Sequence, residues 1–150
     1  MSKKYVNIDN STRPAGDDKY KKIIEQISKD DVCPFCEEHL LKYHKNPIIK
    51  SGTFWTLTTN MYPYKNSKYH FLIIHKGHIT TTKDISKDAW LELYETINWI
   101  ENEYDISGGT FFMRCGDTSK TGASVTHLHS HLVTPDKDKP GYEPVIARIG

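Results

Sequence analysis

The chain has 150 residues, with 20 lysines and arginines against 19 aspartates and glutamates, a formal net charge of +1. This composition argues against binding to nucleic acid, because proteins that neutralise its phosphates carry a clustered basic excess. Hydrophobic residues make up 37% of the chain and aromatic residues 11%, which favours one folded domain over a disordered chain. No apolar run has the length of a membrane span, and residues 1–10 lack the apolar core of a signal peptide.

The cysteines favour a reducing compartment. Their number is odd, with positions 33, 36 and 115, and the chain shows no secretory feature, so a disulfide framework is a poor interpretation. We therefore expect a cytoplasmic protein. Residues 1–32 are expected to form an N-terminal arm with a short helix, residues 33–135 the main domain, and residues 136–150 a C-terminal tail.

Hydrophobic periodicity predicts two helices. The first is short and amphipathic and ends before residue 33. Its apolar positions recur at helical spacing: Tyr20, Ile23, Ile24 and Ile27. The second is long and starts after Ser86, a typical N-cap residue. Its apolar stripe comprises Trp90, Leu93, Tyr94, Ile97, Ile100 and Tyr104, and Trp99 falls on the opposite face.

The remaining pattern predicts a sheet. Segments 54–59, 69–75, 110–115 and 125–133 combine apolar and β-branched residues in the manner of strands. Short turns join them, and a single long helix lies inside the set. The predicted class is therefore α+β, with a mainly antiparallel sheet of about five strands.

Three histidines alternate along the last predicted strand. Because strand side chains alternate between faces, His127, His129 and His131 are expected to line one face at intervals of about 6.6 Å. A neutral imidazole can attack phosphorus and form a covalent nucleotidyl-histidine. In the loop upstream, Gly122 allows close backbone approach to a phosphate and Ser124 offers a hydroxyl. Ordinary half-exposed histidines and a metal held by all three rings are the alternatives.

The sequence CPFC at residues 33–36 has the spacing of a thiolate pair on zinc, and it also resembles glutaredoxin-like redox sites. A redox pair is expected after a buried strand, whereas residues 24–32 have the character of a polar helix end and a turn. A metal needs two more ligands, and His78 and His127 are the candidates. Buried thiols without a ligand are the third interpretation.

The string HLHSHLV at residues 127–133 resembles the motif of the histidine triad (HIT) superfamily of nucleotide hydrolases and transferases, with Ser130 at a usually apolar position. The resemblance covers residues 33–135. It implies that the triad is catalytic, that His129 is the nucleophile and that Ser124 contacts phosphate. His131 would help to hold the phosphoryl group. The implied reaction is attack on the α-phosphate of an adenine nucleotide anhydride or phosphoramidate.

The upstream segment NMYPYKNSKYHFLIIHKGHI, residues 60–79, also resembles HIT proteins. Its Asn-x-Tyr-Pro-Tyr form is most similar to the branch of diadenosine tetraphosphate phosphorylases and related hydrolases, which implies that Asn60 faces the nucleoside sugar. Two positions depart from the family. Arg114 stands where Asn or Gln is usual, and Thr-Pro-Asp at 134–136 follows the triad where Pro-Arg is common. Arg114 would either replace the missing amide as a phosphate contact or point to solvent.

Several HIT proteins and the related galactose-1-phosphate uridylyltransferases bind zinc through two cysteines and two histidines. The ligands that this resemblance implies are Cys33, Cys36, His78 and His127. A site with four protein ligands is closed, so the zinc would be structural.

The resemblance also implies a homodimer, because family members commonly pair through a long helix and an edge strand. The helix around residues 90–100 is the expected contact, with Trp99 as the first residue to test. Among the remaining histidines, His44 is expected in solvent and His70 is expected to be an ordinary half-buried strand residue. Two rival functions stay open: a non-catalytic nucleotide-binding protein, and a thiol-disulfide protein that uses the two cysteines of CPFC.

Overall fold

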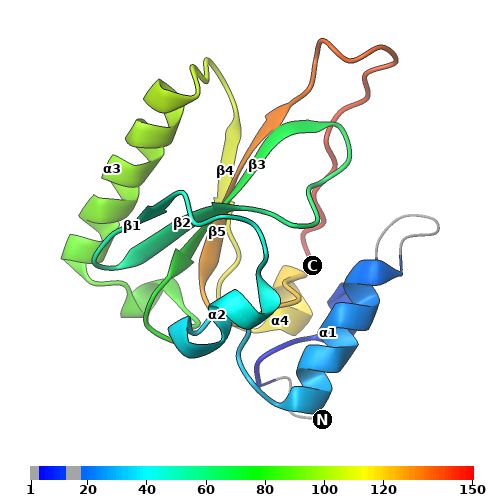
Figure 1. Ribbon diagram of the computed structural model, residues 1–150, viewed down its shortest axis with the longest axis vertical. Helices are drawn as coiled ribbons and strands as arrows, with labels where there is room; N and C mark the ends of the chain where they lie inside the picture. Colours follow the sequence, from blue (N-terminus) through cyan, green and yellow to red (C-terminus); the bar gives the residue numbers. More distant parts are fainter. Residues whose placement is uncertain (1–3, 13–17) are drawn as a thin grey trace.

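A five-stranded antiparallel sheet forms the centre of the protein in the computed structural model, which describes residues 4–12 and 18–150 (Figure 1). In spatial order the strands are β1 (Lys50–Ser51), β2 (Trp55–Thr59), β3 (Ser67–His75), β5 (His129–Pro135) and β4 (Thr110–Met113). The helices are α1 (Lys19–Asp30), α2 (Glu37–Tyr43), α3 (Lys87–Glu103) and α4 (Thr118–Thr121), with 3-10 turns η1 (Ile8–Asn10) and η2 (Thr82–Asp84). The predicted α+β class is confirmed.

The central strand β3 is buried on both faces. Phe71 and Ile73 pack in the cluster that α3 covers, whereas Leu72 and Ile74 pack with Leu40 of α2. A strand between two layers needs apolar side chains in both directions, which explains the continuous run FLII. The two faces of the sheet therefore have different roles, since α3 closes one and leaves the other to α2, α1 and the N-terminal arm.

The long helix begins as predicted but is rotated relative to the predicted stripe. The hydroxyl of Ser86 accepts a hydrogen bond from the backbone N–H of Ala89 at 3.1 Å. The buried positions of α3 are Ala89, Leu93, Thr96 and Ile100. Trp90 and Tyr94, which the predicted stripe included, are 42% and 63% exposed and so lie off the buried face of the helix. Trp99 packs against the core cluster instead of facing away from it.

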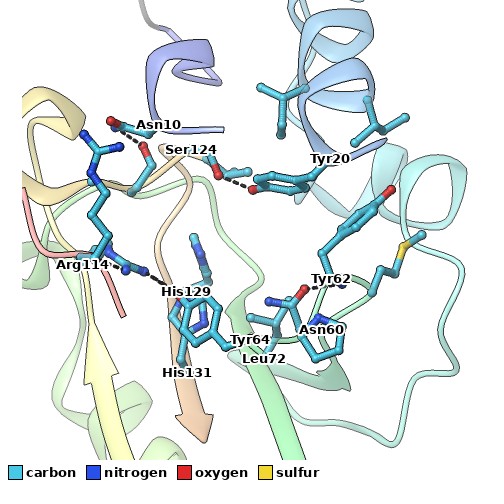
Figure 2. Close-up of a pocket in the computed structure, with 18 of the residues that line it drawn as sticks. Asn10, Tyr20, Asn60, Tyr62, Tyr64, Leu72, Arg114, Ser124, His129 and His131 are labelled. Atoms are coloured by element: carbon cyan, nitrogen blue, oxygen red, sulfur yellow. Dashed lines mark hydrogen bonds between the residues drawn. The ribbon is translucent and has the colours of Figure 1, made fainter. Parts of the chain in front are cut away.

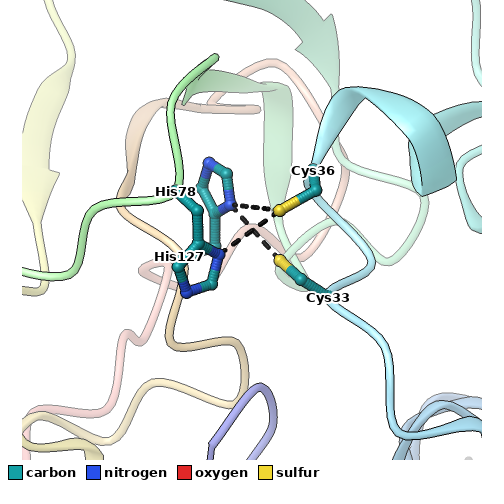
Figure 3. Close-up of side chains that lie close together, drawn as sticks. All are labelled: Cys33, Cys36, His78 and His127. Atoms are coloured by element: carbon teal, nitrogen blue, oxygen red, sulfur yellow. Dashed lines mark hydrogen bonds between the residues drawn. The ribbon is translucent and has the colours of Figure 1, made fainter.

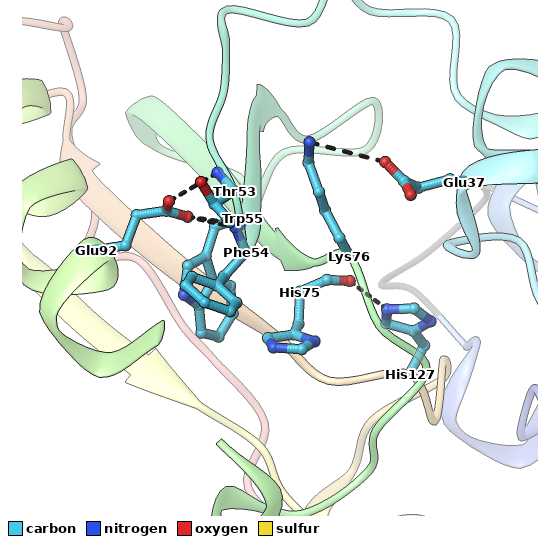
Figure 4. Close-up of polar contacts among 8 residues, drawn as sticks. All are labelled: Glu37, Thr53, Phe54, Trp55, His75, Lys76, Glu92 and His127. Carbon is cyan, nitrogen blue, oxygen red and sulfur yellow. Dashed lines mark hydrogen bonds and ion pairs between the residues drawn. The ribbon is translucent and has the colours of Figure 1, made fainter. Parts of the chain in front are cut away.

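A glutamate joins α3 to the turn between β1 and β2. The Glu92 carboxylate accepts hydrogen bonds from the backbone N–H groups of Thr53, Phe54 and Trp55 at 2.7–2.8 Å (Figure 4). A Cβ at Gly52 would lie 2.6 Å from a carboxylate oxygen of Glu92, so a larger residue there would displace this carboxylate. The turn thereby satisfies three backbone donors that would otherwise need water.

The N-terminal arm holds the loop that precedes β5. Val6 forms an isolated antiparallel bridge with Val125, and the backbone N–H of Asn7 donates to the Ser124 carbonyl at 2.8 Å. The Asn10 side-chain amide donates to two further carbonyls of the loop. The backbone carbonyls of this loop have no partners in the sheet, and the arm supplies them with hydrogen bonds.

Two sequence expectations fail in this region. The last strand starts at His129 and not at residue 125, because residues 126 and 128 donate their backbone hydrogens to the carbonyls of Tyr5 and Ile79 outside the sheet. His127 therefore lies before the strand. Residues 37–43 form α2, which was not predicted. In the ranges 4–12 and 18–150, no helix combines the length and apolarity that crossing a membrane requires.

Candidate functional site

A cavity of about 920 Å³ opens on the face of the sheet opposite α3 (Figure 2). Apolar side chains of α1, β3 and the CPFC segment form part of its wall: Ile23, Ile24, Ile27, Phe35 and Leu72. Polar side chains form another part: Asn60, Arg114, Ser124, His129 and His131. An apolar cavity with a few convergent polar groups is the usual form of a small-molecule site.

His129 presents a lone pair to this cavity. Its Nδ1 lies 2.8 Å from the His127 carbonyl oxygen, which can only accept, so Nδ1 carries the hydrogen and Nε2 the lone pair. The pKa of His129 is lowered to about 4, chiefly by burial; the bond to the His127 carbonyl raises it and the charge of Arg114 lowers it. The ring is therefore neutral at neutral pH, which keeps Nε2 nucleophilic.

His131 has the opposite tautomer because of His70. The backbone N–H of Tyr64 donates to His70 Nδ1 at 3.1 Å, so the hydrogen of that ring is on Nε2. His70 Nε2 lies 2.8 Å from His131 Nδ1 and donates to it. The Asn60 amide nitrogen is farther from His70 Nε2, at 3.2 Å, and is itself a donor. His131 thus carries its hydrogen on Nε2 and is a donor where His129 is an acceptor.

Arg114 faces the cavity, which decides between the two orientations left open by the sequence. Its Nη1 donates to the Tyr64 hydroxyl at 3.2 Å and lies 3.5 Å from His131 Nε2, where two donors face one another because His131 carries its hydrogen on Nε2. Its Nη2 donates to the Arg148 carbonyl at 2.5 Å, and the guanidinium carbon lies 4.9 Å from the centre of the Phe112 ring. Its Nε is buried without a hydrogen-bond partner. The guanidinium is therefore held beside the triad.

The three predicted nucleotide-binding residues line the same cavity. Ser124 is hydrogen-bonded through its hydroxyl to the hydroxyl of Tyr20 from α1. Gly122 ends α4 with a φ of 75°, a left-handed conformation that favours glycine. The Asn60 side-chain oxygen accepts from the backbone N–H of Tyr62 at 2.8 Å, as Figure 2 shows. Their roles stay predictions, but their positions are compatible with one ligand.

A second cluster lies beside the first histidine of the triad (Figure 3). One ligand atom from each of Cys33, Cys36, His78 and His127 lies within 4.8 Å of the other three. The sulfur of Cys33 is 3.3 Å from His127 Nδ1, and the sulfur of Cys36 is 3.3 Å from His78 Nδ1 and 3.7 Å from His127 Nδ1. Tetrahedral zinc, with bonds of about 2.0–2.3 Å, places its ligand atoms about 3.3–3.8 Å apart. The four residues could therefore hold a metal.

The protonation of the cluster also suits a cation. His127 Nε2 donates to the His75 carbonyl at 2.5 Å (Figure 4), which leaves the Nδ1 lone pair directed at the cysteines. Desolvation, followed by the neighbouring Cys33, raises the pKa of Cys36 to about 12. A thiolate at this position needs a positive charge beside it.

Sequence reasoning missed three residues of the site or gave them no role. His70 is 3% exposed and contacts His131 directly, and Tyr20 was assigned only to a helix. His44, expected in solvent, is buried and bonded to the Thr58 hydroxyl at 2.8 Å. The pairing of β3 with β5 brings His70 to the triad, and no local pattern in the sequence carries that register.

Comparison with known families accounts for this arrangement. The family described as "Scavenger mRNA decapping enzyme C-term binding" matches residues 32–144. The chain belongs to this family. A search of curated proteins with this sequence found no match.

Solved structures share the HIT fold. A HIT family hydrolase from Clostridium thermocellum is 22% identical, with a TM-score of 0.53, over 77% of this chain and 90% of its own. A hypothetical histidine triad nucleotide-binding protein from Sulfolobus tokodaii is 20% identical, with a TM-score of 0.56, over 78% and 79%. A zinc-bound histidine triad family protein from Mycobacterium smegmatis is 17% identical, with a TM-score of 0.51, over 73% and 81%.

The hydrogen-bond pattern predicts two different tautomers in this HIT site. At neutral pH we expect His129 to carry hydrogen on Nδ1 and His131 on Nε2, because their backbone and side-chain partners demand it. Nitrogen-15 chemical shifts of the imidazoles distinguish the two forms. A ring that exchanges between the two tautomers gives averaged nitrogen-15 shifts. A hydrogen on His129 Nε2 at neutral pH would contradict this assignment.

Proposed function

We propose that the protein is a nucleotide hydrolase or nucleotidyl transferase whose His129 attacks the α-phosphate of an adenine nucleotide anhydride or phosphoramidate. The observation that carries the proposal is the bond from His129 Nδ1 to the His127 carbonyl, which leaves the Nε2 lone pair in the cavity. The hydrolase named among the solved HIT structures supports this class of reaction.

The proposed reaction has two steps. A bond forms between His129 Nε2 and phosphorus while the bond from phosphorus to the leaving oxygen or nitrogen breaks. The leaving atom keeps the electron pair, and a leaving amine takes up a proton from solvent. Water or phosphate then attacks phosphorus, the electron pair of the phosphorus–nitrogen bond returns to Nε2, and an attacking water releases its proton to solvent. The Nε2–H of His131 donates to the phosphoryl oxygens, because its tautomer makes it a donor. The Ser124 hydroxyl provides a second donor.

In this proposal the nucleoside binds in the opposite part of the cavity, where Asn60 would contact the sugar. Asn60 lines the cavity there, and the apolar wall around Leu72 and Ile27 suits the flat apolar face of a base. The Asn-x-Tyr-Pro-Tyr segment favours an activity of the diadenosine tetraphosphate phosphorylase and hydrolase branch. In this proposal residues 33–135 are the catalytic domain, residues 1–32 the N-terminal arm and residues 136–150 the tail, and described residues of the arm and the tail, among them Asn10 and Glu143, line the cavity.

Replacement of the nucleophile tests the proposal. His129→Ala should lower turnover by at least about 10³-fold, because no other ring offers a lone pair at this position. Steady-state rates are measured with diadenosine tetraphosphate, adenosine 5′-phosphoramidate and a capped dinucleotide, with and without phosphate as acceptor. His39→Ala, outside the cavity lining, is the matched control.

The same assay separates the rival functions. Turnover that survives in His129→Ala would contradict the nucleophile. Nucleotide binding by the unmodified protein without turnover of any substrate in the panel would favour the non-catalytic alternative instead.

We propose zinc as the metal of the Cys33, Cys36, His78 and His127 cluster. The distances suit it, and the M. smegmatis protein of similar fold is described as zinc-bound. With four protein ligands, zinc would supply structural cross-linking and not an open coordination position. The ion would tie the CPFC segment to the residue two positions before the nucleophile.

Metal analysis of variants tests the zinc site. The unmodified protein should contain one zinc per chain, and Cys33→Ser should lose most of it together with thermal stability, since metal binding contributes to folding. Cys115→Ser, an exposed cysteine outside the cluster, should change neither quantity. Purified protein that contains no zinc and is insensitive to chelators would contradict the site and would revive the thiol-disulfide alternative.

We also propose that the protein is a cytoplasmic homodimer. The structure exposes different residues of α3 from the one that the sequence singled out: Trp90, Leu91 and Tyr94 are exposed, and Trp99 packs inward. Phe111 of the edge strand β4 is 38% exposed as well. Large apolar side chains on a helix and on an open strand edge suit pairing with a second copy.

The proposed dimer is tested by mass. Leu91→Glu should convert the particle from the mass of two chains to that of one in light scattering after gel filtration, because a charge is costly inside an apolar contact. Lys29→Glu on α1 should leave the mass unchanged. A single-chain mass for the unmodified protein at micromolar concentration would contradict the dimer.

A further inference from the structure

Arg114 is a cation without a matching anion. In the described ranges 4–12 and 18–150, the recorded ion pairs do not include Arg114. The carboxylate of Glu143 belongs to the cavity lining but is not paired with it either. A charge held close to buried histidines is costly unless something compensates it. The charge balance of the cavity therefore favours an anionic ligand.

The guanidinium is also fixed in position. The Tyr64 hydroxyl, the Arg148 carbonyl and the Phe112 ring contact it on three sides. Among the residues that the structure describes, its buried Nε has no hydrogen-bond partner, so the group has donor capacity that these residues do not use. A planar guanidinium held in this way matches the oxygens of a phosphate, to which it can donate two parallel hydrogen bonds.

Its location relative to the triad indicates which phosphate it would meet. In Figure 2 the histidines lie in the middle of the view, with Asn60 and Leu72 on one side and Arg114 on the other. Arg114 Nη1 is 3.5 Å from His131 Nε2. A nucleotide with its sugar at Asn60 and its α-phosphate at the histidines would extend its next group toward Arg114.

We propose that Arg114 binds the phosphate next to the α-phosphate and so makes the protein selective for nucleoside polyphosphates over phosphoramidates. This inference rests on the proposed function, since it takes His129 as the site of attack. An anhydride leaves as an anionic phosphate, which Arg114 stabilises as the bond breaks. A phosphoramidate leaves as an amine, which gains nothing from a neighbouring guanidinium.

Paired substrates test this selectivity. Arg114→Gln should lower kcat/KM for diadenosine tetraphosphate by about 10- to 100-fold, the worth of a charge-assisted hydrogen bond. The loss of kcat/KM for adenosine 5′-phosphoramidate should be at least about 10-fold smaller than the loss for diadenosine tetraphosphate, because that leaving group carries no phosphate. Arg114→Lys keeps the charge but loses the two parallel donors of the guanidinium. Its kcat/KM for diadenosine tetraphosphate should lie between those of the unmodified protein and Arg114→Gln. Lys87→Met, an exposed cation on α3, is the control for loss of charge. Equal losses on both substrates, or no loss, would overturn the inference and leave the function intact.

A binding measurement on the unmodified protein does not depend on the folding of a variant. Calorimetry should show that the α,β-methylene analogue of adenosine diphosphate binds at least about 10-fold more tightly than adenosine monophosphate. Equal affinities would overturn the role of Arg114. Tighter binding of the diphosphate analogue without turnover of any substrate would instead support Arg114 and contradict the proposed function.

Discussion

The site depends on where each histidine of the triad carries its hydrogen. Backbone carbonyls fix two of the rings: that of His75 holds the hydrogen of His127, and that of His127 holds the hydrogen of His129. His70 fixes the third ring in the opposite tautomer. Three identical side chains within five residues thereby present different atoms: His127 a lone pair on Nδ1 toward the cysteines, His129 a lone pair on Nε2 and His131 a hydrogen on Nε2. The fold produces this difference without changing the residue type.

The sequence predicts the class of the fold and much of the site. Alternation along β5 correctly places His129 and His131 on one face, and the loop with Gly122 and Ser124 lies beside them, because both are local properties of the chain. The prediction that His127 belongs to the same strand was wrong, because β5 begins at His129. The bonds of residues 126 and 128 to Tyr5 and Ile79 remove it from the strand, and these partners are distant in sequence.

The missed features have the same physical origin. His70 reaches His131 through the register of β3 and β5, and Tyr20 reaches Ser124 through the docking of α1. The rotation of α3 depends on which of its faces meets Trp55 and Leu57. Periodicity shows that a face is apolar, but it does not show which neighbour the face meets when aromatic residues lie on several sides.

The contacts of the N-terminal arm affect the order in which the chain folds. The Asn10 side-chain amide donates to the carbonyl of Ala123, which is 113 residues away in the sequence, and the backbone N–H of Asn7 donates to the carbonyl of Ser124. Contacts that close such large loops carry a high entropic cost and form late in folding. The loop before β5 therefore takes its final position only after the strands have paired. A newly made chain would form its sheet first and complete the cavity wall afterwards.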